Sequence, residues 1–408
     1  MKIGIVDAFS TGVNLALDFI KKGVECYHIR STKNVYPYDI PFKETLYLDD
    51  SNIINYLAGL DLFYIIAGSE MGVEKTDYLN AKLSKKFSNS FMTTPNRRNK
   101  YLMHKALSEK GIKCISQFKS NDKEEIKAWV LQHNSFPVVI KPLDSAASDG
   151  VTVCDDMNGV NIAIENILGK QNIFGKTNHE ILVQEFINGT QYFINTLSWN
   201  GNTYITDIWE QVRTRERNQS FRFEGMKLCP GDIAVATGMK DYIYDVLTVL
   251  DLKYGPAHNE IIMTEDGPVL VELNARLMGA SISDNVFRKT LGYTQSSLSV
   301  DMYIDPEKFL SNYCGKEYDI NYNLYEISFL FKKNGLLVNI PKQSQLEKLA
   351  SFCHFYNLPE VNKYVSQTID TQGKPGFLYL LHDTMDIIES DFNFVLDLQN
   401  KDEIFEIK

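Results

Sequence analysis

Short apolar runs alternate with longer amphipathic segments over the first 95 residues of this chain. KIGIVDA, VECYHIR and LDLFYIIAG are typical of strands, whereas TGVNLALDFIKKG repeats its apolar positions at helical spacing. Strands alternating with helices favour a small parallel sheet. The turn DAFSTG lacks the G-x-G-x-x-G spacing of a dinucleotide site, so we interpret it as an ordinary strand-to-helix connection.

A helix with a basic start is predicted next, from Thr94 to about Gly111, in TPNRRNKYLMHKALSEKGI. Arg97, Arg98 and Lys100 lie in its first turns, where positive charge opposes the helix dipole. These cations are therefore either exposed to solvent or placed to bind an anion.

Two further polar segments interrupt the apolar pattern. In FPVVIKPLDSAASDGVTV a strand ends at Lys141 and is followed by a turn of small residues, whose backbone N–H groups suit phosphate oxygens. EQVRTRERNQSFR is basic and contains an aromatic residue, and we interpret it as a loop or lid that contacts carboxylates or phosphates. Within it, Arg222 is a candidate for binding a substrate carboxylate.

A β-hairpin is predicted in GPAHNEIIMTEDGPVLVELNAR. Side chains alternate along a strand, so Glu272, Asn274 and Arg276 share one face. A three-residue loop ending at Gly267 would pair Thr264 with Pro268 and place Glu260 directly across from Glu272.

Opposed carboxylates repel unless one is protonated or a cation lies between them. Two carboxylates and an amide, without His or Cys, form a set of oxygen ligands that suits Mg²⁺ arriving with phosphates. Arg276 would then face a negatively charged reacting group. The alternative is a solvated hairpin face whose charges serve no site.

The C-terminal part changes character near residue 310. YEISFLFKKNGLLVNIP is interpreted as a hairpin with Asn334 and Gly335 at its turn, followed by a helix in SQLEKLASFCHF. The strand GFLYLLHD and the helix TMDIIESDFNFVLDLQ complete a small α+β module.

Composition narrows the class of protein. The 408 residues exceed a single core, so several domains are expected. The net charge of −10 argues against nucleic-acid binding. The six cysteines show no CxxC spacing, and no apolar run is long enough to span a membrane. We therefore expect a cytoplasmic protein without a membrane partner.

Four ordered motifs, NRRNKYLMHKAL, VVIKPLDSAASDGV, LVQEFINGTQYF and GPAHNEIIMTEDGPVLVELNAR, together resemble the ATP-grasp superfamily over residues 1 to 310. The branch they resemble is the carboxylate-amine ligases that include bacterial L-amino-acid (dipeptide) ligases. The resemblance implies a mixed α/β and α+β multidomain fold. Its parts are a Rossmann-like parallel-sheet domain at 1–95, an ATP-grasp domain at 96–309 with a smaller subdomain at about 115–185, and a C-terminal α+β module at 310–408.

The resemblance also assigns residues to roles. It implies that Glu260, Glu272 and Asn274 bind two Mg²⁺ ions, and that Arg276 and Lys141 have catalytic roles. Residues implied to bind ATP are Lys100, Lys141, Ser145, Ser148, Gln184, Glu185, Phe186, Ile187 and Gln191. Ala146 and Ala147 replace glycines that are frequent in the family's phosphate loop. Candidate substrate contacts are Ser69, Glu70, Arg222, His258 and Gly279, with Glu70 suited to an α-amino group.

The implied reaction joins a small-molecule carboxylate, expected to be an amino acid, to an amine through an acyl phosphate, releasing ADP and phosphate. Two alternatives stay open. One is a biotin-carboxylase-like or purine-biosynthesis-like enzyme that activates bicarbonate or formate, and the other is a nucleotide-binding regulatory protein without catalysis. A homodimer is the expected assembly.

Overall fold

The computed structural model describes residues 1–143, 145, 149–173, 175–215, 217–219, 221–279, 284–368 and 373–408. The chain forms two compact units that are interleaved in sequence. The first unit comprises Met1–Cys114, Phe193–Ile208 and Pro230–Asp319, and the second comprises Ile115–Tyr192, Trp209–Cys229 and Ile320–Lys408. The domain boundaries expected from the sequence, near residues 95 and 309, stay predictions.

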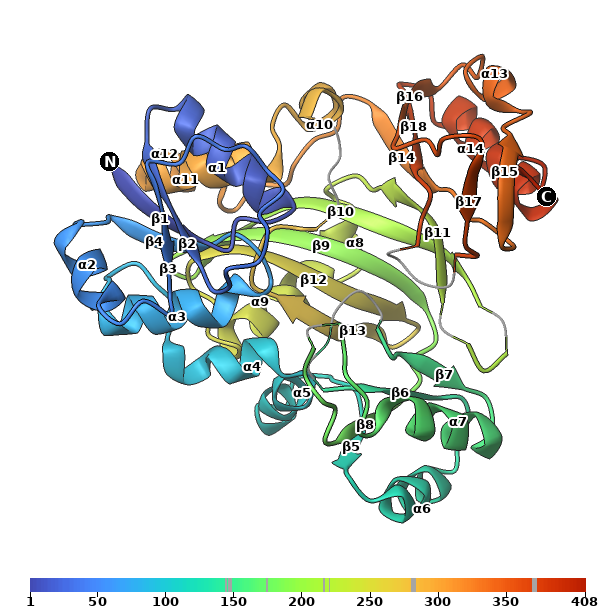
Figure 1. The fold of residues 1–408 in the computed structure, drawn as a ribbon, viewed down its shortest axis with the longest axis horizontal. Coiled ribbons are helices and arrows are strands. Elements are labelled where there is room, and N and C mark those ends of the chain that lie inside the picture. Colours follow the sequence, from blue (N-terminus) through green and yellow to red (C-terminus); the bar gives the residue numbers. More distant parts are fainter. Residues whose placement is uncertain are drawn as a thin grey trace. The chain divides into compact units, whose positions relative to one another are not determined.

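The first unit opens with a parallel sheet in the order β3-β2-β1-β4, as predicted. Its elements, drawn in blue in Figure 1, are β1 Lys2–Val6, α1 Thr11–Lys21, β2 Glu25–Arg30, β3 Glu44–Tyr47, α2 Ile53–Gly59, β4 Tyr64–Ala67 and α3 Gly72–Lys82. The strand order reverses between β1 and β4, and ligands of open α/β sheets commonly bind beside the carboxyl ends of strands at such a point.

The loops after β1 and β4 approach each other so closely that only glycine fits. A Cβ atom on Gly12 would lie 2.0 Å from the carbonyl oxygen of Gly68, and one on Gly68 would lie 2.6 Å from the Cα of Ala8. This contact brings the two loops together at the reversal of strand order.

The predicted helix from Thr94 to Gly111 is two helices, which corrects the sequence interpretation. A short 3₁₀ turn, η1 Phe91–Thr93, leads into α4 Thr94–Arg98, and α5 Lys100–Glu109 follows. Asn99 separates them because its backbone is extended and its side chain accepts hydrogen bonds from the Tyr101 and Leu102 N–H groups. Asn99 is thus the N-cap of α5, and it turns Lys100 into a first-turn residue of a new helix.

The rest of the first unit carries the hairpin and a group of helices. These elements are α8 Ile233–Ala236, α9 Met239–Val249, β12 Gly255–Thr264, β13 Gly267–Asn274, α10 Asp284–Leu291, α11 Gln295–Ile304 and α12 Pro306–Tyr313. Helix α11 packs against α1, although nearly 280 residues separate them in sequence (Figure 1).

Strands β9 Thr190–Trp199 and β10 Asn202–Thr214 contribute residues to both units. They belong to an eight-stranded sheet in the order β13-β12-β9-β10-β11-β14-β18-β16.

The second unit contains an antiparallel sheet in the order β5-β8-β6-β7. Its elements are β5 Gln117–Ser120, α6 Lys123–His133, β6 Val138–Pro142, β7 Thr152–Cys154, α7 Met157–Ile167 and β8 Ile181–Glu185. Alternate residues of β6 and β8, among them Ile140 and Val183, join Ile126 and Ile164 of the two helices in one buried cluster. The residues between them on these strands therefore face away from the helices.

The C-terminal part of the second unit differs from the predicted hairpin. The elements are β11 Arg222–Leu228, β14 Asn323–Ser328, β15 Gly335–Asn339, α13 Gln343–Leu346, β16 Phe352–Tyr356, β17 Lys363–Val365, β18 Phe377–His382, α14 Met385–Asn400 and β19 Glu406–Ile407. Strand β14 pairs with β11 and β18, whereas β15 pairs with β17 and β19 in a separate sheet.

The prediction of a hairpin at Asn334–Gly335 was therefore wrong. The two strands do not pair with each other, because each pairs with strands that are distant in sequence. The predicted helix in SQLEKLASFCHF is also wrong over most of its length, because only α13 is helical and β16 occupies its end. The strand β18 and the helix α14, which packs on β14 and β18 in Figure 1, are confirmed.

Candidate active site

The hairpin of β12 and β13 places Glu260 directly opposite Glu272, and His258 opposite Asn274. The opposition of the two carboxylates was predicted, but the turn was not. Thr264 pairs with Gly267, so the turn is one residue tighter than expected. Ile261 pairs with Leu270, whereas Glu260 pairs with Glu272, so Val271 is an extra residue that forms a bulge in β13. The bulge shifts the register by one residue and so offsets the tighter turn.

A lysine from another element forms an ion pair with one of these carboxylates. Lys100, in the first turn of α5, is buried and places its Nζ 2.8 Å from Oε1 of Glu272. Among the described residues, no group of three or more His, Cys, Asp or Glu side chains is arranged to hold a metal. The predicted ligands are instead two carboxylates and the amide of Asn274. Their oxygen atoms fit Mg²⁺, and their mutual repulsion favours a cation between them.

His258 is held neutral behind the carboxylates. Asn195 donates to Oδ1 of Asp207 at 2.6 Å, so its own Oδ1 accepts from Nδ1 of His258 at 2.8 Å. This assignment leaves Nε2 of His258 unprotonated, 3.8 Å from Oε1 of Glu260. Burial, reinforced by the charge of Arg276, holds the pKa of His258 well below its usual range.

Arg276 follows β13 and is fixed by two contacts. Its Nε donates to Oε2 of Glu70 at 2.9 Å, and its Nη1 donates to the carbonyl oxygen of Leu277 at 2.9 Å. Burial lowers the pKa of the guanidinium, while the charges of Glu272 and Glu260 act in the opposite direction. Arg276 remains a cation beside the two carboxylates.

The other predicted substrate contacts of the first unit gather at the loops after β1 and β4. Glu70 binds Arg276 through one oxygen and Arg98 through the other. The hydroxyl of Ser69 is buried without a hydrogen-bond partner among the described residues. The carbonyl oxygen of Gly279 accepts a hydrogen bond of 2.7 Å from Ser10. The structure thus brings these residues close to Arg276.

In the second unit, the predicted nucleotide-binding residues lie on β6, β8 and their extensions. Val139 pairs with Gln184, and Lys141 shares the face of Val139, so Lys141 and Gln184 lie on the face turned away from α6 and α7. Both are buried. Glu185 accepts from the Ser116 N–H at 2.7 Å, and this bond ties the end of β8 to the start of β5.

Aromatic and polar contacts continue beyond β8. The ring of Phe186 stacks with Phe221 at 6.2 Å between centroids. Ile187 is half-buried. Gln191 accepts a hydrogen bond from Arg213, whose guanidinium lies 4.0 Å from the centre of the Phe221 ring.

The small-residue loop after β6 is described only in part. Ser145 donates to Oδ2 of Asp149 at 2.6 Å. Ser148, Ala146 and Ala147 lie outside the described residues. Arg222 begins β11 and lines a cavity of about 250 Å³ within the second unit, together with Glu224 and Lys332. None of the residues that line this cavity belongs to β6 or β8.

The sequence analysis did not identify three residues of the site, namely Arg98, Asn195 and Asp207. Asn195 and Asp207 are fully buried, but β9 and β10 carry several other polar side chains, so the sequence pattern did not single these two out. Arg98 was noticed as a cation, but its partner Glu70 precedes it by 28 residues and could not be identified by spacing.

Comparison with known proteins agrees with this geometry. Residues 134–284 match the ATP-grasp domain. Over 97% of its length the chain is 30% identical to dapdiamide A synthase of Enterobacter agglomerans, of which the match covers 95%. The chain belongs to the ATP-grasp family of carboxylate-amine ligases.

Other relatives of this ATP-grasp ligase are more distant. Phosphoribosylamine–glycine ligase of Streptococcus pneumoniae is 26% identical over 41% of the chain and 41% of the relative. The crystal structure of L-amino acid ligase from Bacillus licheniformis has the same fold, with a TM-score of 0.77 at 15% identity, covering 100% of this chain and 98% of that one. The fold class expected from the sequence is confirmed. No helix of the described residues is long and apolar enough to cross a membrane.

Proposed function

We propose that this ATP-grasp ligase joins the carboxylate of one amino acid to the amine of another in an ATP-dependent reaction. The observation that carries the proposal is the pair of carboxylates, Glu260 and Glu272, on one hairpin face, with Lys100 of α5 bound to Glu272 and Arg276 beside them. Similarity to dapdiamide A synthase and to an L-amino acid ligase supports an amino-acid substrate class.

The proposed reaction has two steps. The substrate carboxylate attacks the γ-phosphorus of ATP, and ADP leaves, so that an acyl phosphate forms. The amine then attacks the acyl carbon, loses a proton, and phosphate leaves with its electron pair. No protein nucleophile is needed.

The residues of the first unit have proposed roles in both steps. Lys100 places a positive charge on the phosphates, and Arg276 donates to the oxyanion that develops during amine attack. Glu260, Glu272 and Asn274 would hold two Mg²⁺ ions. Bound Mg²⁺ supplies charge that neutralises phosphate oxygens.

The nucleotide is proposed to bind the second unit. Lys141 contacts phosphate, as do Ser145 and Ser148, whereas Gln184, Glu185, Phe186 and Ile187 contact the adenine, with Gln191 nearby. Ser69, Glu70, His258, Gly279 and Arg222 are the proposed substrate contacts. A dimeric assembly and a cytoplasmic location complete the proposal.

Measuring ADP release with Mg²⁺ and ATP against single amino acids and amino-acid pairs tests this function. We expect release that requires a particular pair, together with a product whose mass equals the two amino acids minus water. ATP binding without ADP release for any pair would overturn the amino-acid assignment. ADP release driven by bicarbonate or formate would favour the alternative reaction class.

A separate experiment tests the metal ligands. Binding of Mn²⁺, measured by electron paramagnetic resonance, is compared between Glu272→Ala and Glu265→Ala, an exposed acidic residue at the tip of the same hairpin. We expect only Glu272→Ala to weaken binding. Equal binding by both variants would remove Glu272 from the ligand set.

A further inference from the structure

Three basic side chains within four consecutive residues bind three different elements of the first unit. Arg97 pairs with Asp77 of α3, Arg98 pairs with Glu70 after β4, and Lys100 pairs with Glu272 of β13. The junction of α4 and α5 therefore connects the parallel-sheet domain to the hairpin that carries the candidate metal ligands.

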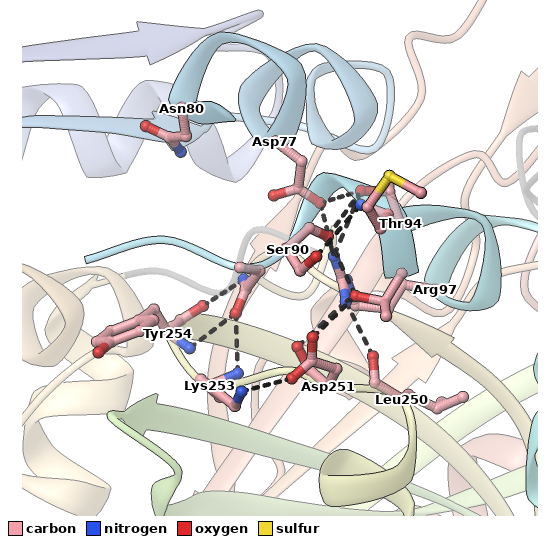
Figure 2. A network of polar contacts seen from close by, with 12 residues as sticks. Asp77, Asn80, Ser90, Thr94, Arg97, Leu250, Asp251, Lys253 and Tyr254 are labelled. Carbon is pink, nitrogen blue, oxygen red and sulfur yellow. Dashed lines mark hydrogen bonds and ion pairs between the residues drawn. The ribbon is translucent and has the colours of Figure 1, made fainter. Parts of the chain in front are cut away.

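Arg97 fixes this junction (Figure 2). Its side chain is 0% exposed and donates to Oδ2 of Asp77 at 2.8 Å, to the Ser90 carbonyl at 2.8 Å and to the Leu250 carbonyl at 2.9 Å. Thr94 donates to the same carboxylate oxygen at 2.7 Å. These buried bonds hold α4 from several directions, so the backbone that carries Arg98 has little freedom.

The neighbouring Arg98 lies in a different environment. The side chains of Arg98, Glu70 and Arg276 are 19%, 14% and 17% exposed, respectively. The carboxylate of Glu70 binds Arg98 with Oε1 and Arg276 with Oε2. Two guanidinium groups thus share one carboxylate.

The contacts of Arg276 show how its guanidinium is oriented. Its Nε and Nη1 are occupied by Glu70 and by the Leu277 carbonyl, and Nη2 has no partner among the described residues. Nη2 is therefore the donor left for a ligand. Because Arg98 holds the second oxygen of Glu70, the carboxylate is fixed in place, and its bond to Nε sets the direction of the Arg276 guanidinium.

We propose that Arg98 is a positioning residue for the ligase reaction, which acts through Glu70 to orient Arg276 toward the reacting acyl group. This inference rests on the proposed function for its catalytic consequence. Arg98 need not touch the substrate, and Glu70 gains a role in addition to the predicted contact with an α-amino group.

The kinetic test uses Arg98→Met and Arg98→Lys, with Arg288→Met, an exposed arginine on α10, as the matched control. Small displacements of a reacting group cost up to about 100-fold in rate, so we expect Arg98→Met to lower kcat by about 10- to 100-fold. The KM for ATP should change less than about threefold, because a group that acts only in the transition state affects kcat rather than ground-state binding. Arg98→Lys restores the charge and should recover part of the loss.

A double-mutant cycle separates positioning from general damage. If Arg98 acts through Arg276, then Arg98→Met should change kcat less than about twofold when introduced into the Arg276→Lys variant. The full loss in that background would overturn the proposal, as would unchanged kcat in Arg98→Met alone.

A spectroscopic measurement tests the geometry without activity. In ¹⁵N-labelled protein, the Nε–H signal of Arg276, assigned by its absence in Arg276→Lys, should show a rigid heteronuclear NOE in the wild type and in Arg288→Met. Arg98→Met should make this signal mobile, and an unchanged signal would overturn the positioning role. If the wild type forms no amide product, the proposed function fails, while this NMR result still decides the role of Arg98.

Discussion

Arg97 and Arg98 are neighbours in sequence and identical in chemistry, yet the protein uses them differently. Arg97 is completely buried and its guanidinium donates to a carboxylate, a hydroxyl and several carbonyl oxygens. Arg98 is partly exposed and shares the carboxylate of Glu70 with Arg276. The first arrangement uses the cation to join segments of the fold, and the second holds Glu70 and Arg276 together at the candidate site.

The difference lies in how deeply each ion pair is buried. Burial of a cation costs free energy unless hydrogen bonds and an opposite charge replace water, and Arg97 has both. Burial raises the pKa of Asp77, and the charge of Arg97 opposes this rise. The side chains of Arg98 and Glu70 are 19% and 14% exposed, so water reaches this pair. A fully buried pair thus contributes to the stability of the fold, whereas a pair that water reaches can also face a ligand.

The largest expected effect is on folding, and it separates the two arginines directly. Arg97→Met removes one partner of a buried pair and leaves Asp77 uncompensated, so we expect the free energy of unfolding to fall by about 3–5 kcal/mol. Arg98→Met, the matched control, should cost less than about 1.5 kcal/mol, because its pair is partly exposed. Urea unfolding at pH 7 measures both. Equal losses of unfolding free energy would show that the two arginines contribute equally to stability.

The next effect is on catalysis. Arg276→Ala removes the proposed donor to the developing oxyanion, and we expect kcat to fall about 100- to 1000-fold, with a smaller loss of ATP affinity. Unfolding free energy should change little compared with Arg97→Met. Steady-state kinetics and ATP titration of the same protein preparation measure the two quantities, and equal losses in both would make Arg276 a nucleotide-binding residue instead.

His28 is another buried basic residue, and it has no acidic partner among the described residues. Its burial favours the neutral form of the imidazole. Burial, with a contribution from Arg30, lowers the pKa of His28 to about 4. The folded protein therefore binds this proton less readily than the unfolded chain, in which the pKa is about 6.5. The stability from this group is complete above pH 6.5 and is lost as pH falls toward 4.

The expected size is about 2.5 kcal/mol of lost unfolding free energy at pH 4.5. His28→Gln cannot titrate, so its stability should fall less than that of the wild type between pH 7.5 and pH 4.5, when both are measured by urea unfolding. An identical pH dependence in the two proteins would contradict the assignment. Comparing slopes cancels the titration of other groups.

The smallest effect is expected at an ion pair in solvent. Lys22 and Asp301 lie 2.8 Å apart, and both side chains are 52% exposed. Lys22→Met should change the unfolding free energy by less than about 1 kcal/mol, and 1 M NaCl should remove most of that difference. A salt-independent loss as large as that of Arg97→Met would show that exposure does not govern these pairs.

The sequence predicted parts of the site that depend on local alternation. The alternation of strands and helices predicted the parallel sheet. The pairing of Glu260 with Glu272 was also predicted, but from a three-residue turn, and it holds because the bulge in β13 offsets the tighter turn. The sequence could not distinguish Arg97, Arg98 and Lys100, which were expected to be exposed or to await an anion. In the structure each binds a protein carboxylate.

The reason is the separation between partners. Asp77 lies 20 residues from Arg97, and Glu272 lies 172 residues from Lys100. Local pattern cannot report which strand will come alongside a helix. The same limit explains the wrong hairpin at Asn334–Gly335: the turn signal is local, but Gly335 pairs with Val365 and packs against the C-terminal Lys408.

The bulge at Val271 also has a practical consequence for protein engineering. It divides the hairpin into a tip, from Ile261 to Leu270, and a half that carries Glu260 and Glu272, each with its own register. Glu265 and Asp266 at the tip are exposed. A fluorescent reporter or a short inserted peptide at this tip would leave the pairing of the carboxylates intact, and it would place an optical signal on the same hairpin as the candidate metal ligands.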